Sequence, residues 1–258
     1  MLRPMSKDPR DPTRKKPSGT GRKPASERAP VSAVTDKRME LLELTLHDLQ
    51  APVAILDVSM RLLASDLAGA DAEVQDTLRD ARRAAGRIRQ YIDHLIVSER
   101  LRHGTLELHR TPVDIASRLK ELTDEYRGHA ALVRATIDAD LSAIYGMIIR
   151  ADETLLVRVF QNLLENAVRH AEGGRVLVTA SRDSVLEIRV QNDGPSIPAS
   201  QQERVFQKFS SGVRNGRTSG LGLYFCRLAL DAHSGTIVIE DDPAWPVTFV
   251  VRLPVSTL

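Results

Sequence analysis

The chain has 258 residues, enough for one large domain or two modest ones, each with its own core. Apolar residues make up 42% and aromatic residues only 4%, which argues against nucleic acid as a stacked partner. The single cysteine, Cys226, excludes an intramolecular disulfide and a zinc site built on several thiolates. Because no apolar run reaches the roughly 20 residues of a membrane span and no signal-peptide core is seen, we expect no membrane span and a cytoplasmic location.

The charge is distributed unevenly along the chain. Residues 1–30 contain nine Lys or Arg and three Asp or Glu, and they hold six of the thirteen prolines. The remaining 228 residues carry 27 basic and 31 acidic side chains. A segment with so few large apolar residues cannot offset its ordering entropy, so we predict a disordered basic tail over residues 1–35. A solvated tether is the simplest role for it, and a weak anchor to an acidic partner is the alternative.

A strict heptad repeat follows the tail. Its apolar positions advance in alternating steps of three and four residues, and they are Met39, Leu42, Leu46, Leu49, Val53, Leu56, Met60, Leu63 and Leu67. After a break at 68–71 the pattern resumes from Val74 to Leu95. This periodicity predicts two long helices in an antiparallel hairpin. Because a lone hairpin leaves half of each stripe exposed, we expect a homodimer in which two hairpins form a four-helix bundle.

A histidine stands beside this apolar seam. His47 follows the seam residue Leu46, and Asp48 follows His47 directly. Pro52, five residues after His47, is predicted to bend the helix. A carboxylate beside an imidazole can hold one ring N–H and leave the other nitrogen as a nucleophile. These residues alone leave two interpretations open: a functional histidine, or a half-exposed surface residue.

A second region begins after the His103–Gly104 break, and its clearest predicted helix spans about 153–171. One face of that helix is apolar, whereas Asn162, Asn166 and Arg169 share the other face. Amide oxygens suit Mg²⁺ and a cation suits phosphate, so this face could hold a metal-bound polyphosphate. An ordinary polar surface is the alternative interpretation.

Alternating strands and two glycine-containing turns complete the chain. Apolar alternation predicts strands around 176–180 and 186–190. The second strand ends in a turn that exposes the Asp193 carboxylate, which could accept a hydrogen bond from an exocyclic amine of a ligand. Residues 210–219 are small and polar, as in a mobile lid, and glycines at 220 and 222 open a helix through Ala232. Such a helix N-terminus can approach phosphate oxygens. Two closing strands are expected at 236–240 and 247–253.

Taken in order, five short motifs resemble the transmitter module of bacterial two-component sensor histidine kinases over residues 36–258. The motifs are HDLQAP at 47–52, QNLLENA at 161–167, NDGPSIP at 192–198, VFQKF at 205–209 and SGLGL at 219–223. The resemblance implies an α+β chain with a histidine-phosphotransfer hairpin at 36–103 and a GHKL-type ATP-binding domain at 104–258. The second part would be a two-layer α/β sandwich.

The resemblance also implies roles for single residues. His47 would accept the phosphoryl group, and Asp48 would orient and activate its ring. Asn166 would be the Mg²⁺ ligand, and Asp193 would read the adenine amine. The residues implied in nucleotide binding are Asn162, Asn166, Arg169, His170, Asp193, Gly194, Phe209, Gly220, Leu221 and Gly222.

The implied activity is ATP-dependent autophosphorylation of His47 and transfer to an aspartate of a response regulator. Arg82, Arg83 and Arg87 could contact that receiver domain, although a solvated helix face is the simpler reading. Ala51 stands where the family usually has threonine or asparagine, so we predict weak phosphatase activity. The input would come from an upstream sensor or regulator on another chain. Two alternatives are a degenerate kinase acting as a nucleotide-binding scaffold and a GHKL ATPase. His94, His103, His109 and His129 show no ligand spacing and are taken as ordinary.

Overall fold

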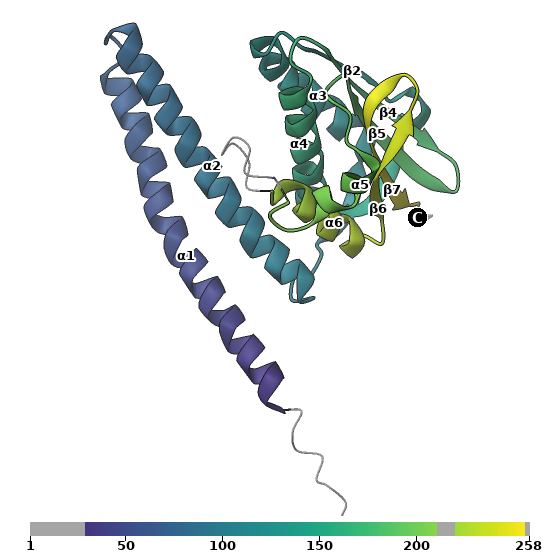
Figure 1. Ribbon diagram of the computed structural model, residues 1–258, viewed down its shortest axis with the longest axis horizontal. Helices are drawn as coiled ribbons and strands as arrows, with labels where there is room; N and C mark the ends of the chain where they lie inside the picture. The colour runs from purple at the N-terminus through teal and green to yellow at the C-terminus, as the bar shows by residue number, and fades with distance from the viewer. Residues whose placement is uncertain (1–28, 211–219, 256–258) are drawn as a thin grey trace, which may run out of the picture. The chain divides into compact units, whose positions relative to one another are not determined.

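The computed structural model describes residues 29–210 and 220–255, and its chain begins with two long helices (Figure 1). Helix α1 spans Ala29–Asp66 and helix α2 spans Ala72–Arg102. The helical hairpin is therefore confirmed, with its break at the expected place. Helix α1 includes residues 29–35, which were expected in the tail, and residues 1–28 of that tail lie outside the described part.

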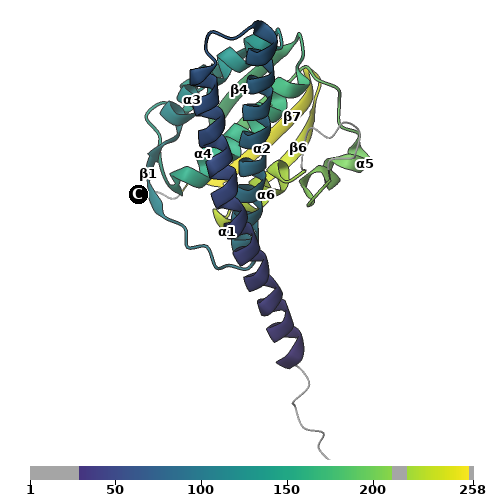
Figure 2. The same ribbon diagram turned by 90° about the vertical axis from the view of Figure 1, so that its left-hand side faces the viewer.

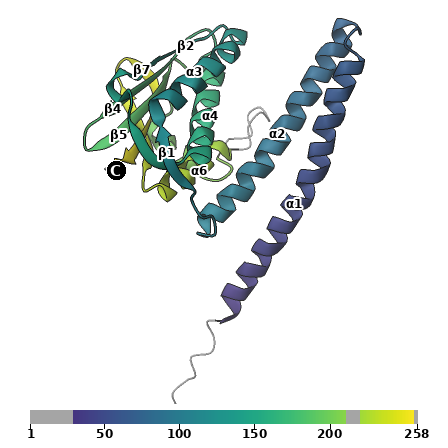
Figure 3. The same cartoon turned by 180° about the vertical axis from the view of Figure 1, so that it is seen from behind.

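The chain divides into two units, 1–44 and 45–258, and every contact given below lies within the second unit. Within it, α2 and the second part of α1 run antiparallel (Figure 3). Gln50 Nε2 donates to Asp93 Oδ1 at 3.1 Å, and Arg89 Nη1 lies 3.0 Å from Asp57 Oδ2. Asp71 caps the start of α2 by accepting from the backbone N–H of Val74 at 3.0 Å.

The rest of the described chain is an α/β domain. Its strands are β1 Arg110–Asp114, β2 Thr136–Asp140, β3 Ile148–Asp152, β4 Arg175–Arg182, β5 Val185–Asn192, β6 Thr236–Asp242 and β7 Trp245–Pro254. Its longer helices are α3 Ile115–Leu132, α4 Glu153–His170 and α6 Gly222–Ala232, and short turns of helix are η1 Ser142–Ile144, α5 Ala199–Gln202 and η2 Arg204–Phe206.

The main sheet has five strands in the order β2-β4-β5-β7-β6, and β1 pairs with β3 in a separate ribbon. The β2–β4 pair is parallel and the other pairs in the sheet are antiparallel, so the sheet is mixed. Helices α3, α4 and α6 lie on one face of it (Figure 2). This confirms the two-layer α/β sandwich and the α+β class of the whole chain.

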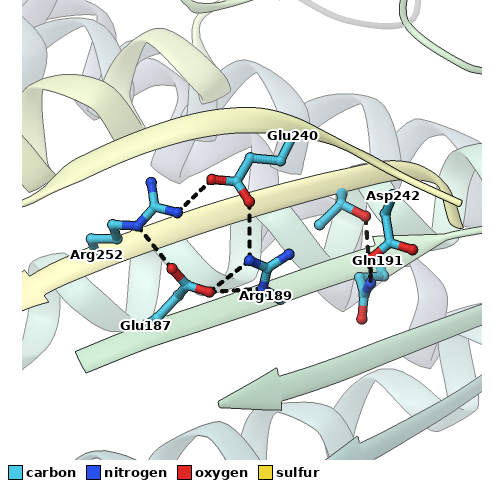
Figure 4. A network of polar contacts seen from close by, with 7 residues as sticks. Glu187, Arg189, Gln191, Glu240, Asp242 and Arg252 are labelled. Atoms are coloured by element: carbon cyan, nitrogen blue, oxygen red, sulfur yellow. Dashed lines mark hydrogen bonds and ion pairs between the residues drawn. The ribbon is translucent and has the colours of Figure 1, made fainter. Parts of the chain in front are cut away.

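The two faces of the sheet have opposite character because side chains alternate along each strand. On β5, Leu186, Ile188 and Val190 are fully buried in the core. The intervening Glu187 and Arg189 join Glu240 and Arg252 in an ion-pair network across β5, β7 and β6 (Figure 4). The core therefore lies between the helices and one face of the sheet.

Two strands of the ribbon end in an aspartate that starts the next helix. Asp114 Oδ1 accepts from the Ser117 N–H at 3.1 Å, and Asp152 Oδ1 accepts from the Leu155 N–H at 3.1 Å. These are N-cap bonds, and those at Asp114 lower the pKa of its carboxyl group. Since His233 Nε2 also accepts from the Asp152 N–H at 3.0 Å, the start of α4 is fixed against the end of α6. In the described part of the chain, no helix is both long and apolar enough to cross a membrane.

Candidate nucleotide-binding site

A cavity of about 720 Å³ opens between the polar face of α4, the start of α6, the end of β5 and one side of α2. Six of the expected nucleotide-binding residues line it, and they are Asn162, Asn166, Arg169, His170, Gly220 and Gly222. The structure thus brings together two motifs separated by more than fifty residues. Of the lid expected at 210–219, only Ser210 lies among the described residues.

The polar face of α4 forms one wall. Asn162 Nδ2 donates to the Arg158 carbonyl at 2.8 Å, which fixes its amide so that Oδ1 faces the start of α6. Asn166 and Arg169 follow on the same face, and Arg169 pairs with Glu165. Partial burial and the charge of Arg169 lower the pKa of His170. At neutral pH this wall offers amides, a neutral imidazole and a guanidinium paired with the Glu165 carboxylate.

The start of α6 forms the second wall, and it needs glycine. Gly220 has φ +64°, a left-handed conformation that favours glycine. A Cβ on Gly222 would lie 2.9 Å from Asn162 Oδ1, so the helix and α4 approach closely. Leu221 occupies the N-cap position, where its side chain cannot accept a hydrogen bond from the first turn. The first turn can therefore donate backbone N–H groups to an anion.

The end of β5 departs from the sequence-based expectation. Asp193 does not line the cavity: its Oδ2 accepts from the Arg175 backbone N–H and from Arg175 Nε, both at 3.0 Å. The neighbouring Asn192 lines the cavity instead and is completely buried. Gly194 is packed behind it, since a Cβ there would lie 2.5 Å from the His170 carbonyl oxygen. The assignment of Asp193 to the adenine amine stays a prediction, and the placement does not favour it.

Helix α2 contributes a wall that the sequence reasoning missed, from Arg87, Gln90, Tyr91 and His94. The His94 ring stacks on Phe225 at 5.1 Å between centroids, and its Nε2 lies 3.3 Å from Asn162 Nδ2. Because Asn162 Nδ2 is a donor, Nε2 accepts and the ring is neutral. Burial, with the charge of Arg158, lowers the pKa of His94 to about 4. No spacing in the sequence pointed to this contact.

Several expected residues lie elsewhere. His47 is in α1, and nothing about its side chain is described; Asp48 is exposed one position later. Phe209 is exposed and does not line the cavity.

The residues present suit Mg²⁺ held partly by a nucleotide. Within residues 29–210 and 220–255, no group of three or more His, Cys, Asp or Glu side chains could hold a metal by itself. Mg²⁺ often keeps waters and takes one or two protein oxygens besides phosphate oxygens. The amide oxygen of Asn166 and the carboxylate of Glu165, both on the cavity wall, fit that pattern.

Comparison with known proteins agrees with this geometry. Residues 151–257 match the family described as "Histidine kinase-, DNA gyrase B-, and HSP90-like ATPase". That segment holds α4, α6 and the glycine-containing turns, so the match covers the elements that form most of the cavity wall.

Longer relatives extend the match into the hairpin. The alginate biosynthesis sensor protein KinB of Pseudomonas aeruginosa is 29% identical over 84% of this chain, and the signal transduction histidine-protein kinase BaeS of Escherichia coli is 26% identical over 81%. The chain spans 37% and 45% of those relatives' lengths. Full-length ShkA, solved in complex with AMPPNP, aligns with a TM-score of 0.69 over 85% of this chain and 46% of its own, at 24% identity. The chain is thus similar to sensor histidine kinases over both its hairpin and its α/β domain, and the matched ATPase family covers residues 151–257.

Proposed function

We propose that the chain is an ATP-dependent protein histidine kinase that phosphorylates His47 and passes the phosphoryl group to an aspartate of a response regulator. The observation that supports this best is the cavity itself. It combines the amide face of α4 with the glycine-opened start of α6, and it lies in a chain whose preceding hairpin carries a histidine followed by an acid. The proposed domains are the hairpin at 36–103 and the ATP-binding domain at 104–258, with the basic tail before them.

The chain's own groups would hold the nucleotide as follows. The first turn of α6 donates backbone N–H groups to the phosphates, and Arg169 adds a positive charge on the opposite wall. Asn166 supplies an amide oxygen for Mg²⁺, which when bound neutralises phosphate charge. Asn162 holds α4 and α6 at a fixed separation through its contact beside Gly222.

The transfer step uses one ring nitrogen of His47 as the nucleophile. The bond between the γ-phosphorus and its bridging oxygen breaks, that oxygen leaves on ADP, and an N–P bond forms. Asp48 accepts the hydrogen bond of the other ring nitrogen and stabilises the positive charge that develops on the ring. Positioning and charge neutralisation carry most of the catalysis, because the transition state of phosphoryl transfer is loose.

The partners follow from the same proposal. A second copy covers the apolar surface of the hairpin in a homodimer, and a receiver domain docks on the hairpin to take the phosphoryl group. The signal comes from an upstream sensor or regulator, and the kinase works in the cytoplasm. Because Ala51 has no polar group to position a water molecule, phosphatase activity toward the phosphorylated regulator is weak.

The deciding experiment is incubation of the full chain with Mg²⁺ and ATP labelled in the γ-phosphate. We expect acid-labile, base-stable label on the wild type and none on His47→Gln, with ADP binding retained by both. His109→Gln is the matched control, because His109 is exposed and outside the cavity, and it should keep the label.

Two other outcomes would point to the alternatives. Label that survives His47→Gln contradicts the assignment of the phosphoacceptor. Nucleotide binding without any label on the wild type indicates a binding scaffold, and multiple-turnover hydrolysis without phosphohistidine indicates an ATPase.

A further inference from the structure

Asn192 is the polar side chain on the cavity wall that the rest of the site leaves without an explanation. It is the last residue of β5, its exposed fraction is 0%, and it lines the cavity. Neither its Nδ2 nor its Oδ1 has a hydrogen-bond partner among the described residues. A buried polar group without a partner costs roughly 1–3 kcal/mol, so such a group is rare unless something else bonds to it.

The other polar groups nearby differ in this respect. The amide of Asn162 bonds to the Arg158 carbonyl and lies within 3.3 Å of the His94 ring. The Asp193 carboxylate is turned toward Arg175, outside the cavity. Asn192 is thus the side chain at this end of the cavity that has both a donor and an acceptor available for a ligand.

The surroundings of Asn192 suit a flat heterocycle. Ile197, Val205, Leu223 and Val247 bring apolar side chains to the cavity wall. Gly194 keeps the backbone close, since a Cβ on it would lie 2.6 Å from Asn192 Nδ2. An apolar slot with one buried amide is the usual construction of a site that binds an aromatic ligand and fixes its orientation.

The chemistry of an amide differs from that of a carboxylate at such a position. An ionised carboxylate only accepts hydrogen bonds, so it can receive the 6-amino group of adenine but repels the 6-oxo group of guanine or hypoxanthine. An amide presents an acceptor beside a donor. In one orientation it matches the 6-amino group and N1 of adenine, and after a 180° flip it matches the 6-oxo group and N1–H of a 6-oxopurine. With no described partner holding either orientation, both are open to Asn192.

We propose that Asn192 is the base-reading side chain and that it makes the base subsite accept 6-oxopurine nucleotides as well as adenine nucleotides. The inference rests on the proposed function only in taking a purine nucleotide as the ligand, and it does not depend on phosphoryl transfer to His47. The discrimination between the two classes of purine should therefore be weak in the wild type.

Equilibrium binding of ADP and IDP to the full chain, measured by titration calorimetry, tests this directly. IDP carries the 6-oxo group without the 2-amino group of guanine, so it isolates the change of donor and acceptor. We expect the two dissociation constants to lie within about tenfold of each other, because each base can form two hydrogen bonds to the amide. A preference for ADP of a hundredfold or more would overturn the proposal, whatever any variant does.

Two isosteric variants show which side chain forms hydrogen bonds to the base. Asn192→Asp should raise the IDP-to-ADP ratio of dissociation constants by roughly tenfold or more, because O6 would face a carboxylate. Asp193→Asn makes the opposite exchange one residue further on, at a side chain outside the cavity. If Asp193→Asn shifts the ratio and Asn192→Asp does not, the base is read by Asp193 and the proposal is wrong.

The outcomes separate this inference from the proposed function. Binding of ADP with strong rejection of IDP removes the inference and leaves the kinase assignment intact. Binding of neither nucleotide removes both. Should Asn192→Asp fail to fold, as judged by its melting curve, the wild-type ratio still decides.

Discussion

The α/β domain buries its large apolar side chains, whereas the hairpin leaves many of them exposed. In the domain the large apolar side chains of α4 and β5 are fully buried, and Leu163 and Ile188 have exposed fractions of 0%. In the hairpin Ile55 and Leu62 are 67% and 61% exposed. Among the hairpin side chains that the structure describes, the exposed large apolar residues are Leu44, Leu49, Ile55, Leu56, Val58, Leu62, Leu63, Leu67 and Ile88.

This difference teaches that the two regions reach stability by different means. The domain closes its core with its own two layers, whereas the hairpin buries only one edge of its seam, at Leu46, Val53, Ala85 and Ile92. Exposed apolar surface on this scale marks a site of association in a folded protein. A second hairpin with the same repeat is the partner that the heptad pattern predicts.

Removing a sealed side chain should have the largest effect on stability. We expect Leu163→Ala to lower the free energy of unfolding by about 3–5 kcal/mol, because it leaves a cavity in the core of α4. Chemical denaturation of the full chain measures this. Leu132→Ala, at a position 74% exposed in the same domain, is the control and should change stability by less than about 0.5 kcal/mol. Equal losses in both variants would contradict the contrast drawn here.

Charging the open stripe should break the dimer without unfolding the domain. Leu56 and Leu63 are seven residues apart and partly exposed, so both lie on one stripe of α1. Two lysines there should weaken dimerisation by a thousandfold or more, about 4 kcal/mol, because their charges would have to be buried in the bundle. Analytical ultracentrifugation measures the change. Asp76→Lys, at an exposed position of α2 outside its apolar repeat, should leave the dimer intact.

The sequence predicted the strongly periodic elements and missed those that depend on neighbours. The hairpin, α4, α6 and strands β4 to β7 all follow from repeats of 3.5, 3.6 or 2 residues. The elements between residues 105 and 152 were not predicted. They are the 18-residue helix α3, the short turn η1 and the strands β1, β2 and β3, which have five residues each; β2 pairs at the edge of the sheet with only Ile137 buried. So short a strand has too few alternations to stand out from a loop.

The site shows the same division. The amide face of α4 and the glycines of α6 were predicted from local patterns, but the wall formed by α2 arises from a contact between residues 68 apart in the chain. The inward position of Asn192 could have been predicted from the sequence. It continues the inward alternation of residues 186, 188 and 190, which puts Asn192 inside and the outward-facing Asp193 beside Arg175.

His94, in the wall formed by α2, makes the stability of the folded chain depend on pH. The pKa of His94 is about 4 in the folded chain, below its ordinary value of 6.5, so the unfolded chain binds more protons between these values. Stability is therefore complete above pH 6.5 and falls as the pH drops toward 4. We expect the wild type to lose roughly 2 kcal/mol more than His94→Phe between pH 7 and pH 5. Denaturation at both pH values measures this, and parallel losses would show that His94 does not titrate as described.

The polar face of the sheet should give the smallest effect. The network of Glu187, Arg189, Glu240 and Arg252 is partly open to solvent, with side chains 19–34% exposed, and it lies on the face opposite the core (Figure 4). Water already solvates such ions, so Glu187→Gln should cost less than about 1 kcal/mol. ADP binding should not change, because the network does not line the cavity. A double-mutant cycle with Arg252→Gln measures the coupling. A coupling as large as the Leu163→Ala loss would mean that this face, and not only the apolar layer, holds the sheet together.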